Sequence, residues 1–132
     1  MLSGCLIKEV ELRYFKEERL RCTHCGDSGM DMEFMQKVDE LRHELGFPFI
    51  VNSAYRCPEH PIEFKKSSPG AHTTGRAIDI GVRGNEAYRL LQGALRAGFT
   101  GIGVNQKGDS RFIHLDDIEP SGERPRPWIW SY

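Results

Sequence analysis

Two histidines and one aspartate in the second half of the chain could together hold a catalytic metal ion. His72 lies in a loop, whereas Asp79 and His114 lie in stretches that alternate apolar and polar residues. Two imidazoles and one carboxylate suit zinc, and three protein ligands leave a fourth position open to water, as in catalytic sites. The alternative is a buried histidine with satisfied hydrogen bonds and ordinary surface aspartates, because isolated matches of this kind are weak evidence.

Strand alternation predicts that Asp79 and His114 share one face of a sheet. Side chains alternate between the two faces of a strand, so in the stretch around Asp79 the isoleucines fall on one face and Asp79 falls on the other. In residues 112–116, His114 and Asp116 lie opposite the apolar side chains. In residues 101–104, the second face carries only glycines, which is expected to leave room for a ligand.

The whole pattern predicts an α+β fold with two main helices packed on a small, mainly antiparallel sheet. The first helix is expected to begin after an N-cap at Asp31 or Ser28 and to end at Gly46. The second is expected to begin at Gly84 and to end at Gly98, with buried positions at Ala87, Leu90, Leu91, Ala94 and Leu95. Strands are expected at residues 49–53, 76–82, 101–104 and 111–115, and no regular element is predicted in the tail after Pro120.

Length and composition favour one domain over residues 1–132, with residues 1–30 as an N-terminal segment that contains a cysteine loop. The 18 basic and 19 acidic residues give a net charge of -1, which provides no field for binding nucleic acid. The sequence has no apolar run long enough for a membrane span. Its start lacks the features of a signal peptide, although Leu2–Cys5 has the form of a lipoprotein cleavage box. We expect a monomer that is made in the cytoplasm.

Three segments together resemble the zinc D-Ala-D-Ala carboxypeptidase family, whose fold is shared with the hedgehog signalling domain. They are Ser53–Arg56, the H-x-x-G-x-A-x-D pattern of His72–Asp79, and Phe112–Asp116. The resemblance extends from about Asp31 to the C-terminus and is closest to the short, single-domain branch common in phages and prophages. It implies that His72, Asp79 and His114 bind one zinc ion. It also implies hydrolysis of peptidoglycan stem peptides, as a D-Ala-D-Ala carboxypeptidase or a murein endopeptidase, with phage-type release to the cell wall as one route to the substrate.

The resemblance also implies that Arg56 binds a carboxylate of the substrate or polarises its carbonyl. The guanidinium group suits this role, because its fixed fork pairs bidentately with carboxylates. Ser53 is expected to lie near Arg56 as a hydrogen-bond partner. The alternatives are a surface ion pair for Arg56 and an ordinary strand-end serine for Ser53.

The general base is where the chain departs from the family. Family members carry an acidic residue three positions before the second histidine ligand, and here that position is Arg111, which cannot act as a base. The candidates are Asp116, on the strand face of His114, and Asp109, in the preceding turn, whereas Asp117 is expected to face away. Asp116 is the predicted functional residue, either as the base or as a partner that orients a ligand imidazole.

The departure at Arg111 supports a second hypothesis for the function. The chain could be a non-catalytic, zinc-binding structural or binding protein on the same fold, for example a component of a phage particle.

The cysteines suggest a separate, structural zinc site. Cys22-x-x-Cys25 and Cys57-x-x-His60 provide four ligands with zinc spacing at each end, and such a site would join the N-terminal loop to the loop after Ser53. The alternatives are reduced cysteines without metal or a disulfide. A third hypothesis for the function is an interaction module built on this zinc.

Overall fold

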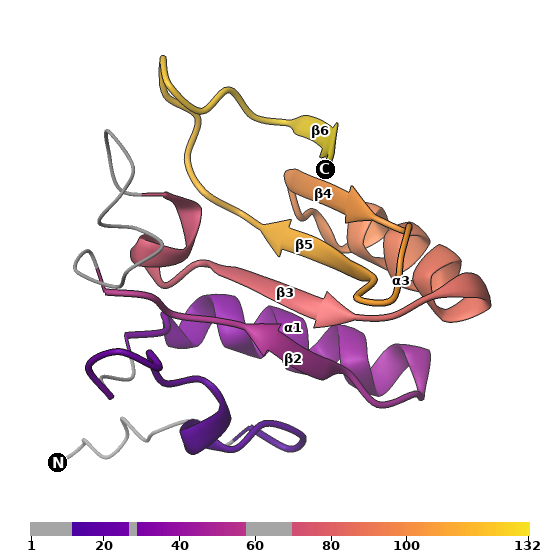
Figure 1. Ribbon diagram of the computed structural model, residues 1–132, viewed down its shortest axis with the longest axis horizontal. Coiled ribbons are helices and arrows are strands. Elements are labelled where there is room, and N and C mark those ends of the chain that lie inside the picture. Colours follow the sequence, from indigo (N-terminus) through magenta and orange to yellow (C-terminus); the bar gives the residue numbers. More distant parts are fainter. Residues whose placement is uncertain (1–11, 27–28, 58–69) are drawn as a thin grey trace, which may run out of the picture.

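The computed structural model describes residues 12–26, 29–57 and 70–132. Its elements in chain order are η1 (Glu17–Arg19), α1 (Met32–Leu45), β2 (Ile50–Ser53), η2 (Ala71–Thr74), β3 (Ala77–Gly81), α3 (Gly84–Ala97), β4 (Gly101–Asn105), β5 (Phe112–Asp116) and β6 (Trp128–Ser131). Figure 1 shows α1 running along β2 and β3, and α3 lying behind β4. None of the helices in these ranges has the length and apolar character needed to cross a membrane.

The strands form one sheet in the order β2-β3-β5-β4-β6. All neighbouring strands are antiparallel except β4 and β6, which are parallel. The predicted α+β class is therefore confirmed, including its two main helices and its mainly antiparallel sheet.

The ends of the two helices follow the residues that the sequence singled out. The Asp31 carboxylate accepts a hydrogen bond of 3.0 Å from the Phe34 N–H, which satisfies one of the free donors at the start of α1. Gly46 ends α1 in the left-handed conformation, and Gly98 ends α3 in the same way. One predicted core position is wrong. Leu95 is 60% exposed, because it lies about 100° around the helix axis from buried Ala94.

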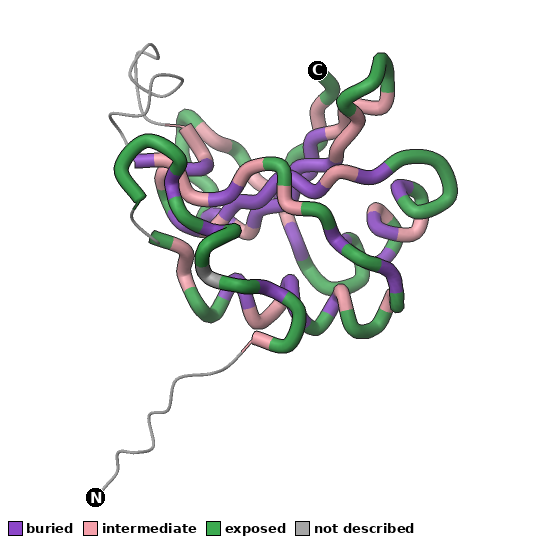
Figure 2. The backbone as a smooth tube through the Cα atoms, turned by 60° about the horizontal axis from the view of Figure 1, so that its bottom comes forward, coloured by how far each residue is buried: buried purple, intermediate pink, exposed green. Residues whose placement is uncertain are grey.

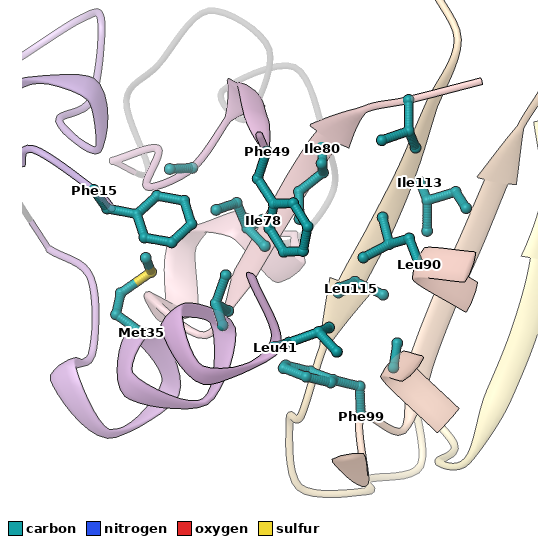
Figure 3. Packing of buried hydrophobic residues seen from close by; sticks show 14 of the residues in the cluster. Phe15, Met35, Leu41, Phe49, Ile78, Ile80, Leu90, Phe99, Ile113 and Leu115 are labelled. Atoms are coloured by element: carbon teal, nitrogen blue, oxygen red, sulfur yellow. The ribbon is translucent and has the colours of Figure 1, made fainter. Parts of the chain in front are cut away.

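The hydrophobic core lies between the two helices and one face of the sheet. Figure 3 shows Ile78 and Ile80 of β3, Ile113 and Leu115 of β5, and side chains of α1 and α3 gathered in one cluster. Phe15 from the N-terminal segment belongs to the same cluster. In Figure 2 the buried residues concentrate in the strands and on the inward sides of the helices. The helices therefore cover one sheet face and leave the other available for a site.

Strand β6 was not predicted. Its sequence follows a tail with three prolines, and Trp128 and Ile129 are both exposed, so it lacks the apolar alternation of a half-buried strand. The strand forms by parallel pairing with the free edge of β4, with Gly101 opposite Trp128 and Gly103 opposite Trp130. This strand brings the end of the chain to the edge of the sheet, beside β4.

Candidate metal centre

The polar face of the sheet collects the predicted site residues in adjacent positions. Asp79 on β3 lies directly opposite His114 on β5, and Ser53 on β2 lies opposite Asp79. Asp116 lies two residues beyond His114 on the same strand face, as the alternation predicts. The apolar neighbours of these residues point to the core, so the core itself fixes the direction of the site residues.

His72 reaches the sheet from the short helix η2. The helix ends at Gly75, whose φ of +77° is a left-handed conformation that favours glycine. A Cβ atom at Gly75 would also collide with the carbonyl oxygen of Gly29. The Gly75 carbonyl accepts a hydrogen bond of 2.8 Å from the Asp31 N–H, which ties this turn to the start of α1. The turn therefore places His72 over β3.

His72, Asp79 and His114 converge on one point. Their ligand atoms all lie within 4.8 Å of one another, and all three residues are buried. One oxygen of Asp79, Oδ1, lies 3.2 Å from His72 Nε2 and 3.0 Å from His114 Nδ1. The distances suit three groups arranged around a common centre.

The other nitrogen of each imidazole is held by a hydrogen-bond acceptor. His72 Nδ1 donates to the carbonyl oxygen of Ala54 at 2.7 Å, and His114 Nε2 donates to Asp116 Oδ2 at 2.7 Å. The second nitrogen of each ring, Nε2 of His72 and Nδ1 of His114, faces Asp79 Oδ1. Two imidazole nitrogens and a carboxylate oxygen therefore surround one point where a cation can bind. The donor set, its geometry and its outer partners all fit a zinc ion.

The charges at this centre are strongly coupled. Burial opposes ionisation of Asp79, but hydrogen bonds with His114 and His72 outweigh it and lower the pKa of its carboxyl group. Burial likewise disfavours the imidazolium form of His114, yet its bonds to Asp116 and Asp79 raise its pKa. The carboxylates thus create an environment that stabilises positive charge.

Asp116 uses all of its acceptor capacity within the protein. Its side chain is fully buried, and Arg126 donates to both oxygens, at 2.9 Å from Nε to Oδ1 and 2.8 Å from Nη2 to Oδ2. Oδ1 also accepts the Ile118 N–H at 3.4 Å, and Oδ2 accepts His114 Nε2. Although burial opposes its ionisation, the bonds from His114 and Arg126 lower the pKa of Asp116 to about 2. This contact pattern is that of a group that orients a ligand imidazole.

Protein side chains occupy the space over the face of β4 that carries only Gly101 and Gly103. The expectation that this face leaves room for a ligand is therefore wrong. A Cβ atom at Gly101 would collide with the Asp116 carboxylate, and one at Gly103 would lie 2.6 Å from the Trp130 indole nitrogen. The two glycines therefore make space for the side chains that support His114.

Arg56 and Ser53 lie together, as predicted, with Arg56 Nε donating to Ser53 Oγ at 3.2 Å. Both line a cavity of about 260 Å³ next to the metal centre, since the neighbouring Ala54 holds His72. The other lining residues are Arg19, Arg21, Thr23, Asn52, Ala54 and Tyr55. Three arginines and no acidic residue line this cavity, which gives it a positive potential suited to anionic groups.

The remaining candidates lie away from the centre. Asp109 is exposed in the turn before β5, where its backbone carbonyl accepts a hydrogen bond of 3.2 Å from Arg83. Arg111 donates to the carbonyl of Gly108 in the same turn. Asp117 pairs bidentately with Arg76 and also binds Lys37, consistent with its predicted direction away from His114.

Residues of the tail complete the centre, and apart from their aromatic and basic character nothing in the sequence indicated this role. The Trp130 ring packs against His114 at a centroid distance of 5.1 Å, and the Arg126 guanidinium lies over the same ring at 5.3 Å. Burial raises the pKa of the Tyr132 phenol against an opposing hydrogen bond from Trp130. The charges of Asp79 and Arg56 also act on this phenol.

The predicted cysteine ligands are only partly within the described residues. Cys22, Cys25 and Cys57 have their sulfur atoms within 4.8 Å of one another, whereas His60 lies outside the described ranges, as does the alternative helix cap Ser28. Burial opposes the thiolate form of Cys22, but backbone hydrogen bonds from Cys57, Cys25 and His24 lower its pKa to about 7.

Replacing Gly75 by alanine should disturb both the fold and the metal centre. The left-handed φ costs roughly 1–2 kcal/mol for alanine, and the collision with Gly29 adds about 1–3 kcal/mol of overpacking. Gly46→Ala is the matched control, because its φ is +78° but a Cβ atom there meets nothing within 4 Å. Urea unfolding and zinc titration should show a larger loss of stability in Gly75→Ala, and a loss of zinc affinity in that variant alone. Equal effects of the two variants would mean that this contact does not position His72.

Comparison with known proteins places the chain in a family. No curated protein matches its sequence significantly. A family profile described as Peptidase M15 matches residues 13–116, which include His72, Asp79, His114 and Asp116 and most of the sheet. The match covers well over half of the chain and agrees with the observed fold. The chain therefore belongs to the Peptidase M15 family, the zinc-dependent metallopeptidases of the D-Ala-D-Ala carboxypeptidase type.

Proposed function

We propose that the protein is a zinc metallopeptidase that hydrolyses peptide bonds in peptidoglycan stem peptides. The observation that carries this proposal is the convergence of His72, Asp79 and His114, with the outer nitrogen of each imidazole already tied to an acceptor. Family membership supports the reaction class, and the positive cavity beside the centre supports a peptide substrate that carries carboxylates.

Each residue of the centre has a distinct role in this proposal. His72, Asp79 and His114 hold the ion, with Ala54 and Asp116 fixing the imidazole tautomers. A bound zinc ion supplies Lewis-acid chemistry, which polarises the scissile carbonyl and makes water nucleophilic near neutral pH. Asp116 is a positioning residue in this assignment rather than the base, because all of its acceptor sites are taken by His114, Arg126 and Ile118.

Arg56 is assigned to substrate binding. It lines the cavity with Arg19 and Arg21, and its Nε atom donates to Ser53 Oγ. A carboxylate of the stem peptide can therefore bind there in a charge-assisted way while the adjacent peptide bond faces the metal centre.

The direct test is turnover of purified murein fragments by the zinc-loaded protein, with the released amino acids and peptides identified by mass spectrometry. A chelator should stop the reaction, and added zinc should restore it. The masses of the products distinguish removal of a terminal D-Ala from cleavage within the stem peptide. Tight zinc binding without release of any product would instead favour the non-catalytic alternative on this fold.

Arg56→Ala should reduce kcat/KM on those fragments. A charge-assisted hydrogen bond contributes about 1.5–3 kcal/mol, which corresponds to a loss of about 10- to 150-fold. Arg56→Lys should recover only part of this loss, because the ammonium group keeps the charge but not the fork. Arg83→Ala is the matched control, since Arg83 is exposed and contacts the distant turn at Asp109. Equal kinetics of Arg56→Ala and the wild type would remove Arg56 from the substrate site.

A further inference from the structure

The three cysteines within the described ranges form a second cluster, separate from the proposed catalytic centre. Cys22 and Cys57 are buried and Cys25 is exposed, and no disulfide joins them. Their sulfur atoms lie within 4.8 Å of one another although Cys22 and Cys57 are 35 residues apart in the chain. The fold therefore brings together three soft ligands from two segments.

Hydrogen-bonding groups contact two of these sulfur atoms, those of Cys22 and Cys57. Cys22 Sγ accepts the backbone N–H groups of Cys57 at 3.2 Å and of His24 at 3.4 Å. The backbone N–H of Cys25 also bonds to it, and His24 Nδ1 lies 3.4 Å from Cys57 Sγ. A hydrogen bond of 2.9 Å from the Gly26 N–H to the Cys22 carbonyl closes the turn that orients the His24 and Cys25 N–H groups. Donors that point at sulfur favour thiolates, and they are the outer partners that orient thiolate ligands of metals.

We infer that Cys22, Cys25 and Cys57 bind a structural zinc ion. Three thiolates at this spacing would repel one another without a cation between them, and thiolate ligands select zinc over the hard cations magnesium and calcium. Three sulfur atoms cannot all be satisfied by one disulfide. Zinc fits the role because structural zinc sites are tetrahedral and rich in cysteine, often with a Cys-x-x-Cys pair. This inference concerns the cysteines alone and stands whether or not the protein is a peptidase.

The ion would fix the backbone that orients His72. The Ala54 carbonyl accepts the His72 side chain, the Arg56 N–H donates to the His72 carbonyl at 3.2 Å, and Cys57 follows directly. The other half of the cluster lies in the segment that carries Arg21 and Thr23, which line the same cavity as Arg56. A zinc ion at the cysteines would therefore join the two walls of that cavity.

The experiment uses the full chain with His72 and His114 both replaced by alanine, so that the catalytic centre is removed from the measurement. Cobalt(II) added to this protein should give an intense thiolate-to-cobalt charge-transfer absorption, and elemental analysis should give about one zinc ion per chain. Cys25→Ser in this background should abolish the absorption and the bound zinc. Cys25 is the residue to change because it is exposed, so its replacement disturbs packing least. Cys5→Ser is the matched control and should change neither.

A second measurement on the wild-type protein does not depend on any variant. Bound zinc should protect the thiols of Cys22, Cys25 and Cys57 from alkylation, and chelation should expose them. Equal alkylation rates with and without zinc, a disulfide in freshly prepared protein, or an unchanged cobalt spectrum in Cys25→Ser would each overturn the inference. Failure of the peptidase proposal would appear differently, as a lack of murein turnover in wild-type protein that retains its cysteine-bound zinc.

Discussion

Replacing His114 by alanine is expected to empty the catalytic centre of zinc and to reduce murein hydrolysis to the uncatalysed level. The remaining His72 and Asp79 provide only two of the three ligands that catalytic zinc sites use. Enzymes accelerate their reactions on the order of 10⁶-fold or more, so the loss of the ion should remove nearly all measurable rate. The fold should persist, because Ile113 and Leu115 make the core contacts of β5 and Arg126 still neutralises Asp116.

Elemental analysis and murein turnover together check this result. His43→Ala is the matched control, since His43 lies in α1 and bonds to the exposed Tyr14 hydroxyl. It should keep both zinc and activity. His72→Ala should behave as His114→Ala does. Zinc content and rate unchanged in both His72→Ala and His114→Ala would show that these histidines are not the ligands.

Asp116→Asn should weaken both folding and zinc binding while leaving the chemistry intact. Asn is neutral, so Arg126, whose side chain is only 5% exposed, would be a buried cation without its counter-charge. Breaking a buried ion pair from one side reduces the free energy of unfolding by about 3–5 kcal/mol. Loss of the bond to His114 should reduce zinc affinity about 10- to 100-fold. Saturating zinc should then restore most of the rate.

The measurements are urea unfolding, zinc titration and the rate at saturating zinc. Asp109→Asn is the paired control, because Asp109 is exposed in the turn before β5. The Asp109→Asn variant should change neither the free energy of unfolding nor the zinc affinity. A large loss of its rate of murein hydrolysis would identify Asp109 as the base. A loss of about 10²- to 10⁴-fold in zinc-saturated Asp116→Asn would return the role of general base to Asp116.

The sequence predicted the sheet face of the centre because strand alternation leaves little freedom. Once Ile78 and Ile80 must face the core, Asp79 must face away, and the same holds for His114 between Ile113 and Leu115. The position of His72 could not be derived in this way. It depends on the turn at Gly75 and its contact with Gly29, which no periodic pattern encodes, so the sequence marked His72 as a candidate by residue type and family resemblance but did not place it over the sheet.

The surroundings of the centre were harder to predict than its ligands. Glycines at positions 101 and 103 show that a side chain is missing, but they do not show which other group fills the space. Arg126 and Trp130 reach the centre only because β6 pairs with the edge of β4. The sequence of the tail does not predict this parallel pairing. Similarly, Cys22-x-x-Cys25 suggests a metal site by its spacing, whereas the proximity of Cys57 depends on the tertiary fold.

Because Arg126 forms a buried ion pair with Asp116, the unit that folds cooperatively extends beyond the residues that match the family. The similarity ends at Asp116, whereas the partner of that carboxylate is ten residues further along the chain. A fragment cut where the similarity ends would retain every proposed metal ligand but leave a buried anion without its cation. It would also strip β6 from β4 and expose a row of unpaired backbone groups, which other chains can use as a template for aggregation. Insolubility of such a fragment would therefore reflect where it was cut rather than instability of the full chain.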